Sequence, residues 1–336
     1  MRDPVTDFEY PDAWVAACRS PDLLPDVRRG LAVLTASGTV LRRGFTTGTT
    51  AAAACKAAVL SLALDAVEEV AVTLPCGITV RVPADAYRGR ASCRKDAGDY
   101  PSDVTAGLEF VATAVPSLSG GVQFVPGEGI GSFGRNTLRH LQGTPAISAP
   151  ALDCIRRSID EAVEEAGLCG TTVILTVPRG AEVAQKTLNP KIGVQGGISV
   201  LGTTGFVEPW DDHMTEGVLD RIARAGAVVL TTGRLGLRYS RLLFPEHEAI
   251  LVGSKLHEAL RAADGDVVLC GLPGLILKFM NPDVLEGTGC ATVEELSTTP
   301  LWEETARREL AAFRVRYPRV RVLIVDREGR VIGGSP

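Results

Sequence analysis

The sequence predicts an α/β protein in two parts: a two-layer α+β sandwich, followed by a Rossmann-like α/β domain of three layers. Three observations favour this class. The first half has a hairpin pattern beside one alanine-rich helix, and the second half alternates strands with helices. The composition agrees, because 36 glycines, 20 prolines and an aromatic fraction of only 5% indicate small side chains and many turns.

The first half divides into an N-terminal extension, residues 1–36, and a sandwich domain, residues 37–200. Proline breaks allow only short helices in the extension. Residues 69–74 and 78–82 alternate apolar and polar side chains around Pro75-Cys76-Gly77, which predicts a hairpin. The other elements expected here are helices at 11–19, 22–30, 47–65 and 154–166, strands at 104–114, 121–125 and 172–177, and a short helix or loop at 180–187.

The second half, residues 201–336, predicts a doubly wound sheet. Strands that alternate with helices imply parallel βαβ units. The expected helices lie at 215–225, 236–243, 254–263 and 302–316, and the expected strands at 227–230, 249–252, 267–270 and 320–325.

Charge and composition exclude several classes of protein. A net charge of −5 gives no basic footprint for nucleic acid, and no apolar run is long enough to predict a membrane span. Eight cysteines lie far apart with no C-x-x-C pair, which favours a reduced, cytoplasmic protein. Four scattered histidines have no metal-ligand spacing, so no protein-bound metal is expected.

A loop rich in threonine and glycine opens the alanine-rich helix. Thr46, Thr47, Gly48 and Thr49 stand where an N-cap and a first helical turn are expected. Free N–H groups and the helix dipole at such an end attract anions, so the loop is a candidate site for a negatively charged ligand. A capped core helix without a ligand is the competing interpretation, and the residues alone favour it.

Three carboxylates crowd one turn: Asp96, Asp99 and Asp103. Clustered carboxylates raise one another's pKa, which suits proton transfer. An ordinary surface turn of Asp, Gly and Pro is the alternative.

Two glycine-rich segments follow. Residues 127–134 contain G-x-G-x-x-G after a strand, but neither a long helix nor a later acidic residue completes a dinucleotide fingerprint. Residues 188–209 hold three glycine clusters at the expected domain junction, which favours equally a ligand crevice and a hinge without a ligand. A third turn, 231–236, places Arg234 at the carboxyl edge of the parallel sheet, where open α/β sheets bind ligands.

Together these segments resemble one family, the cobalt-precorrin-5B C1-methyltransferases of anaerobic cobalamin biosynthesis, the CbiD family. The matching stretches are Leu41-Arg-Arg-Gly-Phe-Thr-Thr-Gly-Thr with its alanine helix, Asp96-Ala-Gly-Asp99 with Asp103-Val-Thr105, Gly127-Glu-Gly-Ile-Gly131, the stretch from Lys186 to Pro209, and Thr231-Thr-Gly-Arg-Leu-Gly236.

The resemblance implies transfer of a methyl group from S-adenosylmethionine to C1 of a cobalt-containing tetrapyrrole, which converts cobalt-precorrin-5B to cobalt-precorrin-6A. It implies a small-molecule partner, no nucleic acid and no membrane, and it leaves a homo-oligomer open. Asp99, Asp103 and Glu128 are the implied catalytic residues. The implied substrate-binding residues are Arg43, Thr46, Thr47, Gly48, Thr49, Lys56, Asp96, Asn189 and Arg234. The implied methyl-donor residues are Gly129, Gly131, Gly197, Gly202, Thr203, Thr204, Gly205, Gly233 and Gly236.

The chain also departs from the family pattern. Tyr100 stands where a second consecutive Asp is usual, and Leu272-Pro-Gly-Leu275 replaces a His-x-Gly-Lys pattern. These changes leave two alternatives open: a diverged paralogue that methylates a different ring substrate, and a non-catalytic tetrapyrrole-binding protein. A nicotinamide-dependent oxidoreductase, which rests on the glycine loop at 129–134 alone, is a further alternative.

Overall fold

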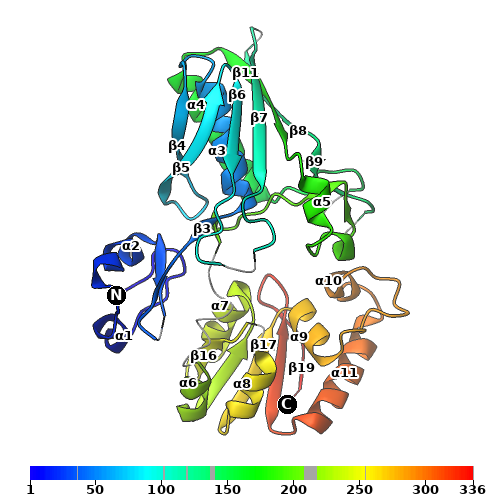
Figure 1. Ribbon diagram of the computed structural model, residues 1–336. Helices are drawn as coiled ribbons and strands as arrows, with labels where there is room; N and C mark the ends of the chain where they lie inside the picture. Colours follow the sequence, from blue (N-terminus) through cyan, green and yellow to red (C-terminus); the bar gives the residue numbers. More distant parts are fainter. Residues whose placement is uncertain are drawn as a thin grey trace. The chain divides into compact units, whose positions relative to one another are not determined.

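The computed structural model describes residues 1–35, 37–100, 103–118, 120–136, 141–207, 218–253 and 255–335. Its contacts divide the chain into two compact units, Met1–Trp210 and Asp211–Pro336. In Figure 1 the blue-to-green part of the chain forms the first unit and the yellow-green-to-red part forms the second. Each unit has its own hydrophobic core.

The first unit begins with a small segment that has a core of its own. It contains α1 (Asp12–Ala16), the 3₁₀ turn η1 (Pro21–Leu23), α2 (Leu24–Arg29), β1 (Ala32–Leu34) and β2 (Val40–Arg42). β1 and β2 pair antiparallel. Tyr10, Val27, Ala32 and Leu34 are buried together beneath these elements.

The main sheet of the first unit has six strands in the order β4-β5-β6-β7-β11-β8. They are β4 (Val67–Thr73), β5 (Thr79–Tyr87), β6 (Arg90–Arg94), β7 (Glu109–Pro116), β8 (Gly121–Pro126) and β11 (Gly170–Thr176). Neighbours are antiparallel except β11 and β8, which are parallel. Side chains along β5 alternate between buried and exposed, as expected of a sheet with one solvated face.

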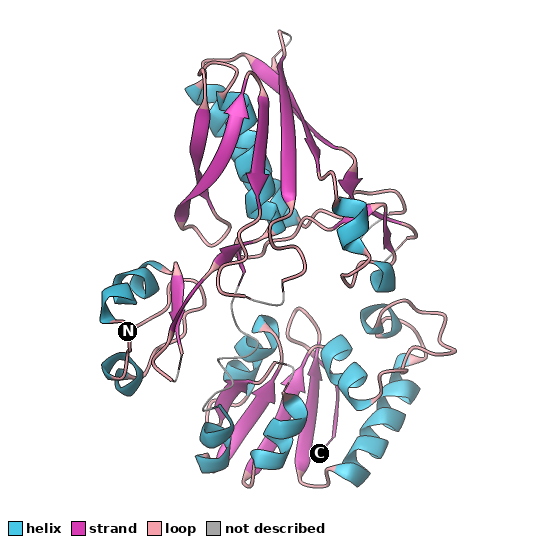
Figure 2. Ribbon diagram, viewed as in Figure 1, coloured by secondary structure: helices cyan, strands magenta, loops and turns pink. Residues whose placement is uncertain are grey.

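Two helices, α3 (Thr47–Leu60) and α4 (Ala149–Glu165), cover one face of this sheet (Figure 2). All 14 residues of α3 are buried, because short alanine side chains let α4 and the sheet both approach the helix closely. The structure thus confirms an alanine-rich core helix, although it ends at Leu60 and not at residue 65.

Short strands tie together loops that are far apart in the sequence. β3 (Gly44–Phe45) pairs with β14 (Phe206–Val207), β9 (Gly129–Ile130) with β13 (Gly197–Ile198), and β10 (Ser132–Phe133) with β12 (Val194–Gln195). The helix α5 (Gly180–Ala184) and the 3₁₀ turn η2 (Pro190–Ile192) lie between these pieces in the sequence.

The second unit contains a five-stranded sheet in the order β16-β15-β17-β18-β19. Its strands are β15 (Ala227–Thr231), β16 (Glu248–Leu251), β17 (Asp266–Gly271), β18 (Val320–Val325) and β19 (Val331–Ser335). All pairs are parallel except β18 with β19. The helices are α6 (Val218–Arg224), α7 (Arg234–Leu243), α8 (Leu256–Ala262), α9 (Pro273–Met280), α10 (Val293–Leu296) and α11 (Trp302–Arg316).

Apolar clusters lie on both faces of this second sheet. Val229 and Val268 pack with Tyr239 of α7, whereas their strand neighbours pack in a separate cluster with α6, α8, α9 and α11. Because β15 pairs with both β16 and β17, the order of the strands reverses between β15 and β17. The predicted doubly wound, three-layer fold is confirmed.

Other expectations differ at their edges. The strand expected from residue 104 begins at Glu109, because residues 104–107 form a turn, and β19 was not anticipated. The start of the helix expected at 215–225 and the end of the 188–209 segment lie outside the described residues.

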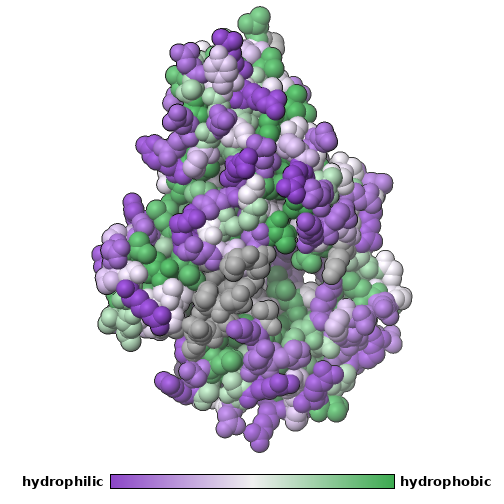
Figure 3. Space-filling view, viewed as in Figure 1, coloured by the Kyte–Doolittle hydropathy of each residue, from purple (hydrophilic) through white to green (hydrophobic). Residues whose placement is uncertain are grey.

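Within the described ranges, no helix combines the length and hydropathy of a bilayer span. On the face shown in Figure 3, hydrophilic residues cover much of the surface and hydrophobic ones form small patches.

Candidate functional site

The first turn of α3 is capped by the chain itself. Thr46 Oγ1 accepts a hydrogen bond from Thr49 N at 3.2 Å, and Thr49 Oγ1 donates to Gly205 O at 2.7 Å. A Cβ on Gly202 would lie 2.5 Å from Thr46 Oγ1, so only glycine fits there. The Thr46–Thr49 bond therefore caps the helix itself, and the Thr49 hydroxyl holds the loop of residues 199–205 at Gly205.

The next two residues of α3 bind the same loop. Thr47 Oγ1 accepts from Leu201 N at 2.8 Å, and Gly48 N donates to Leu201 O at 2.8 Å. A Cβ on Gly48 would lie 2.7 Å from Ala151 Cβ of α4. The groups expected to attract an anion are thus used by the protein, which supports the capped-core interpretation of this loop.

Asp96 and Asp99 fasten the end of β2. The Arg42 guanidinium binds both carboxylate oxygens of Asp96, and Asp99 Oδ2 accepts from Arg42 N at 2.7 Å. Burial acts to raise the pKa of Asp96, but the bonds from Arg42 and from Gly98 N–H hold it below its ordinary value. This direction is opposite to the one predicted for crowded carboxylates.

Asp103 forms a nearly buried ion pair with Lys95, their side chains being 11% and 2% exposed. Its Oδ1 also accepts from Thr105 N at 2.8 Å and from Thr105 Oγ1 at 2.6 Å. Burial opposes ionisation, yet Lys95 and Thr105 hold the pKa of Asp103 below its ordinary value. Asp103 is therefore an ionised acceptor that shapes its own turn, which makes it a poor proton acceptor.

The glycine loops meet one another. Gly129 has φ +78°, and a Cβ there would lie 1.9 Å from Val177 O; a Cβ on Gly197 would lie 2.1 Å from Gly129 O. Gly131 N donates to the loop at Ile198 O. Asn189, 6% exposed, donates from Nδ2 to Gly197 O at 3.1 Å. These residues were expected to line a ligand site, but their small size admits neighbouring backbone.

Two cations expected to bind substrate are buried in ion pairs. Arg43, with a side chain 0% exposed, binds Asp3 at 2.6 Å. Lys56, with a side chain 8% exposed, binds Glu161 of α4 at 2.5 Å. Arg43 neutralises a buried acid, and Lys56 neutralises Glu161, which is 38% exposed, so both charges are used in pairs within the first unit.

Three other predicted residues lie nearer the surface. Glu128 and Thr203 are exposed, and Thr204 Oγ1 accepts from Phe206 N at 3.4 Å. Among the described residues, no ion pair engages the Glu128 carboxylate. In the same ranges, no group of three or more His, Cys, Asp or Glu residues is placed to hold a metal ion.

Two of the matching sequence stretches face a common hollow. The turn that contains Asp103 and Val104 lines a space of about 550 Å³ together with residues 185–188, which follow α5. Such a volume is typical of small-molecule sites. Lys186 lines this hollow, and Arg94 lines an adjoining one of about 260 Å³. No role was predicted for Lys186, although it lies inside a matching stretch, and no motif signalled Arg94.

The second unit presents its own candidate site where the strand order reverses. Thr231 ends β15 and Thr232 follows it, and their hydroxyls are buried with no partner in the described chain. Gly233 has φ +76°, and a Cβ on Gly236 would lie 2.3 Å from Thr231 Oγ1. Arg234 begins α7 at this edge. The predicted residues Gly233, Arg234 and Gly236 are thus brought together, but in the other unit from the remaining candidates.

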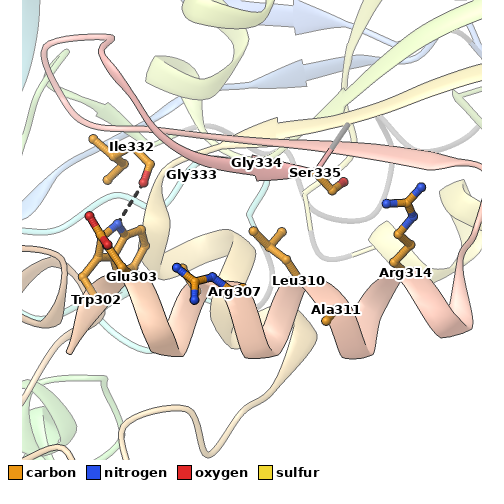
Figure 4. Close-up of a pocket in the computed structure, with 11 residues that line it drawn as sticks. Trp302, Glu303, Arg307, Leu310, Ala311, Arg314, Ile332, Gly333, Gly334 and Ser335 are labelled. Carbon is orange, nitrogen blue, oxygen red and sulfur yellow. Dashed lines mark hydrogen bonds between the residues drawn. The ribbon is translucent and has the colours of Figure 1, made fainter.

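A further groove of about 410 Å³ lies between α11 and β19 (Figure 4). Leu310 and Gly333 line it, and Trp302 Nε1 donates to Ile332 O at 2.9 Å beside it. None of its residues belongs to a stretch that matches the family pattern, so catalysis is not assigned to it.

Known proteins match this chain along its whole length. The family model described as CbiD matches residues 34–209. A Methanoculleus marisnigri protein named cobalt-precorrin-5B C(1)-methyltransferase is 86% identical, with 100% of both chains covered. A Methanoregula boonei protein of the same name is 56% identical, again with 100% of both chains covered.

A solved structure agrees with these relatives. The 1.9 Å crystal structure of the cobalamin biosynthesis protein CbiD from Archaeoglobus fulgidus has a TM-score of 0.68 and 37% sequence identity, and the match covers 92% of this chain and 97% of that one. The family model, the full-length relatives and the solved structure agree, and they show that the chain belongs to the CbiD family.

Proposed function

We propose that this chain transfers the methyl group of S-adenosylmethionine to C1 of cobalt-precorrin-5B, forming cobalt-precorrin-6A. The observation that carries the proposal is the 86% identity, over the whole of both chains, to a curated protein named for this reaction. Such identity supports this activity over the diverged-paralogue and non-catalytic alternatives. The eight free cysteines favour a reducing compartment such as the cytoplasm.

Methyl transfer depends mainly on how the methyl donor and the ring carbon are positioned. S-adenosylmethionine supplies an electrophilic methyl group on a sulfonium. The residues of the chain have to hold the ring carbon in line with that methyl group and exclude water. Positioning of this kind lowers a barrier by about 7–11 kcal/mol.

We place the methyl donor at the carboxyl edge of β15 and β17. Ligands of open α/β sheets bind where the strand order reverses, and this edge carries Gly233 and Gly236. The Thr231 side chain is fully buried, and its hydroxyl has no partner among the described residues. A buried hydroxyl without a hydrogen bond costs free energy, so a ligand that bonds to it recovers that free energy on binding. The residues present therefore fit a polar donor molecule.

The candidate carboxylates divide by their surroundings. Glu128 and Asp99 are exposed, so we retain them as the groups that accept a proton. Asp103 is held in an ion pair with Lys95, so we assign it the role of positioning its own turn.

The activity is tested with S-adenosylmethionine carrying a ¹³C-methyl group. We expect the purified chain to place the label at C1 of cobalt-precorrin-5B, detected by NMR. Label on a different tetrapyrrole only would favour the diverged paralogue, and no label on any tetrapyrrole would overturn the proposal.

The donor site is tested with Thr231→Val. Valine has nearly the same shape and removes the buried hydroxyl, so the free protein should be as stable as before or more stable. Binding of S-adenosylhomocysteine, followed by calorimetry, should nevertheless weaken. Thr113→Val, at an exposed position of β7, is the matched control. Unchanged binding with Thr231→Val would remove this edge from the mechanism.

A further inference from the structure

The two adjoining hollows of the first unit form one surface. Val104 lines both of them. The larger is completed by Tyr100, Asp103 and residues 185–188, and the smaller by Arg94, residues 106–109, Pro178 and Arg179. Loops from well-separated parts of the sequence therefore meet around a single exposed side chain.

Most charges around Val104 are already paired. Asp103 is neutralised by Lys95, and Arg179 binds Glu182 at 2.8 Å. Glu109, beside Arg94 on the neighbouring strand, accepts from Ser92 Oγ at 2.5 Å.

Two exposed cations remain. Arg94 and Lys186 have no ion pair in the described parts of the chain, and each stands on the lining of one hollow. Arg94 stands opposite Glu109 in the sheet. The pKa of Glu182 is lowered by Arg179 and also by Lys186, which lies four residues after it, so both cations are partly balanced. The cations of this surface still outnumber its acids by one, which makes it suitable for an anionic ligand.

Two exposed apolar side chains also line the larger hollow. Val104 is 50% exposed and Leu188 is 68% exposed. These two side chains give the larger hollow apolar contact groups beside Lys186. A ligand that fits has a flat apolar body and negatively charged arms.

We propose that this surface binds the carboxylate side arms of the tetrapyrrole, with Arg94 and Lys186 holding the arms and Val104 and Leu188 contacting the ring. The inference rests on the proposed function and adds the location and the recognition groups of the acceptor. Arg suits a carboxylate because its fork donates two parallel bonds, and Lys186 adds a mobile second charge.

Direct binding tests this without the labile substrate. The probes are cobyrinic acid, a stable corrin whose arms are free carboxylates, and cobinamide, in which the arms are amides. Binding of each to the full chain is followed by calorimetry at low ionic strength. We expect Arg94→Ala with Lys186→Ala to weaken cobyrinic acid binding by about tenfold or more and to leave cobinamide binding unchanged.

The matched control is Arg90→Ala. Arg90 lies four residues before Arg94 on the same strand and the same exposed face, so it removes an equal charge outside the hollows. Equal weakening by Arg90→Ala and by Arg94→Ala alone would reduce the effect to overall charge and overturn the proposal. Circular dichroism and thermal melting check that each variant is folded.

Lysine acetylation gives a second measurement on the unchanged protein. Cobyrinic acid should protect Lys186 from acetic anhydride several-fold, whereas exposed Lys278 of α9 should react as before. Equal reactivity of Lys186 with and without the corrin would overturn the location.

The two proposals fail in distinguishable ways. A chain that methylates cobalt-precorrin-5B normally with both cations removed keeps the proposed function and loses this surface. A chain that binds cobyrinic acid through Arg94 and Lys186 but methylates no tetrapyrrole keeps the surface and loses the function.

Discussion

Replacing Asp3 by Asn tests whether the N-terminal segment is fastened to the first unit by a buried charge. The Asp3 and Arg43 side chains are 1% and 0% exposed. Arg43 donates to the two Asp3 oxygens at 3.0 and 2.6 Å, and also to Gly30 O at 3.0 Å. Asp3→Asn removes the negative charge while keeping one acceptor oxygen, so it leaves a buried guanidinium with no counter-charge.

The expected loss is about 3–5 kcal/mol, the usual effect of breaking a buried ion pair by removing one partner. The carbonyl of Gly30 and the remaining amide oxygen still accept from Arg43, which favours the lower end, near ~3 kcal/mol. Asp7→Asn is the control in the same segment. It breaks the Arg2–Asp7 pair, whose side chains are both 69% exposed, and such surface pairs contribute about 1 kcal/mol or less.

Hydrogen exchange read by mass spectrometry is the assay, because it reports the segment and the sheet separately. We expect faster exchange in β1 and β2 with Asp3→Asn, by roughly a hundredfold for ~3 kcal/mol. If α3 and the six-stranded sheet accelerate equally, the segment and the unit unfold together. Exchange in β1 and β2 that matches Asp7→Asn would refute the reasoning.

Three further outcomes are expected. Gly48→Ala should lower the unfolding free energy in urea by about 1–3 kcal/mol, because the new methyl group collides with Ala151 of α4, where there is no room for a side chain. The pKa of Asp103 is lower in the folded state than in the unfolded state, so its ionised form stabilises the fold above its ordinary pKa. That stabilisation is lost as the pH falls through the lower folded value. Urea denaturation at several pH values should therefore show that Asp103→Asn loses less stability on acidification than the unchanged chain. Iodoacetamide should label exposed Cys169 in the native chain. Cys55 should react only on unfolding, because it is buried and burial raises the pKa of its thiol. Mass spectrometry of the two peptides checks both results.

Much of the fold was readable from periodicity. The alanine run predicted α3, and the alternation around Pro75 predicted the antiparallel pair of β4 and β5. The strand-and-helix order after residue 215 predicted the parallel sheet. The elements that the sequence did not predict are short or irregular. For example, β19 contains Gly333 and Gly334 and lacks the alternation of apolar and polar side chains that marks a strand. The strand expected from residue 104 starts later, because Asp103 folds the residues after it into a turn.

The site was harder to read, for a physical reason. Glycine and threonine show that something approaches the backbone closely, but the sequence does not say what. At Gly48, Gly129 and Gly202 the neighbour is the chain itself. Arg43 and Lys56 likewise carry charges whose partners, Asp3 and Glu161, are remote in the sequence, so they resemble free cations until the structure pairs them.

This suggests why sequence motifs and ligand-facing residues need not coincide. Asn189 clamps the loop at Gly197, and Asp103 fixes the turn that presents Val104. Both of these motif residues use their polar atoms in bonds within the protein, and each fixes the backbone beside a side chain that is exposed. A site has to be kept within a fraction of an ångström of its working geometry, and side chains whose own bonds are satisfied do this best. Within the matching stretches, Asp103 and Asn189 therefore build the frame, and Val104 and Lys186 are the side chains that we propose meet the substrate.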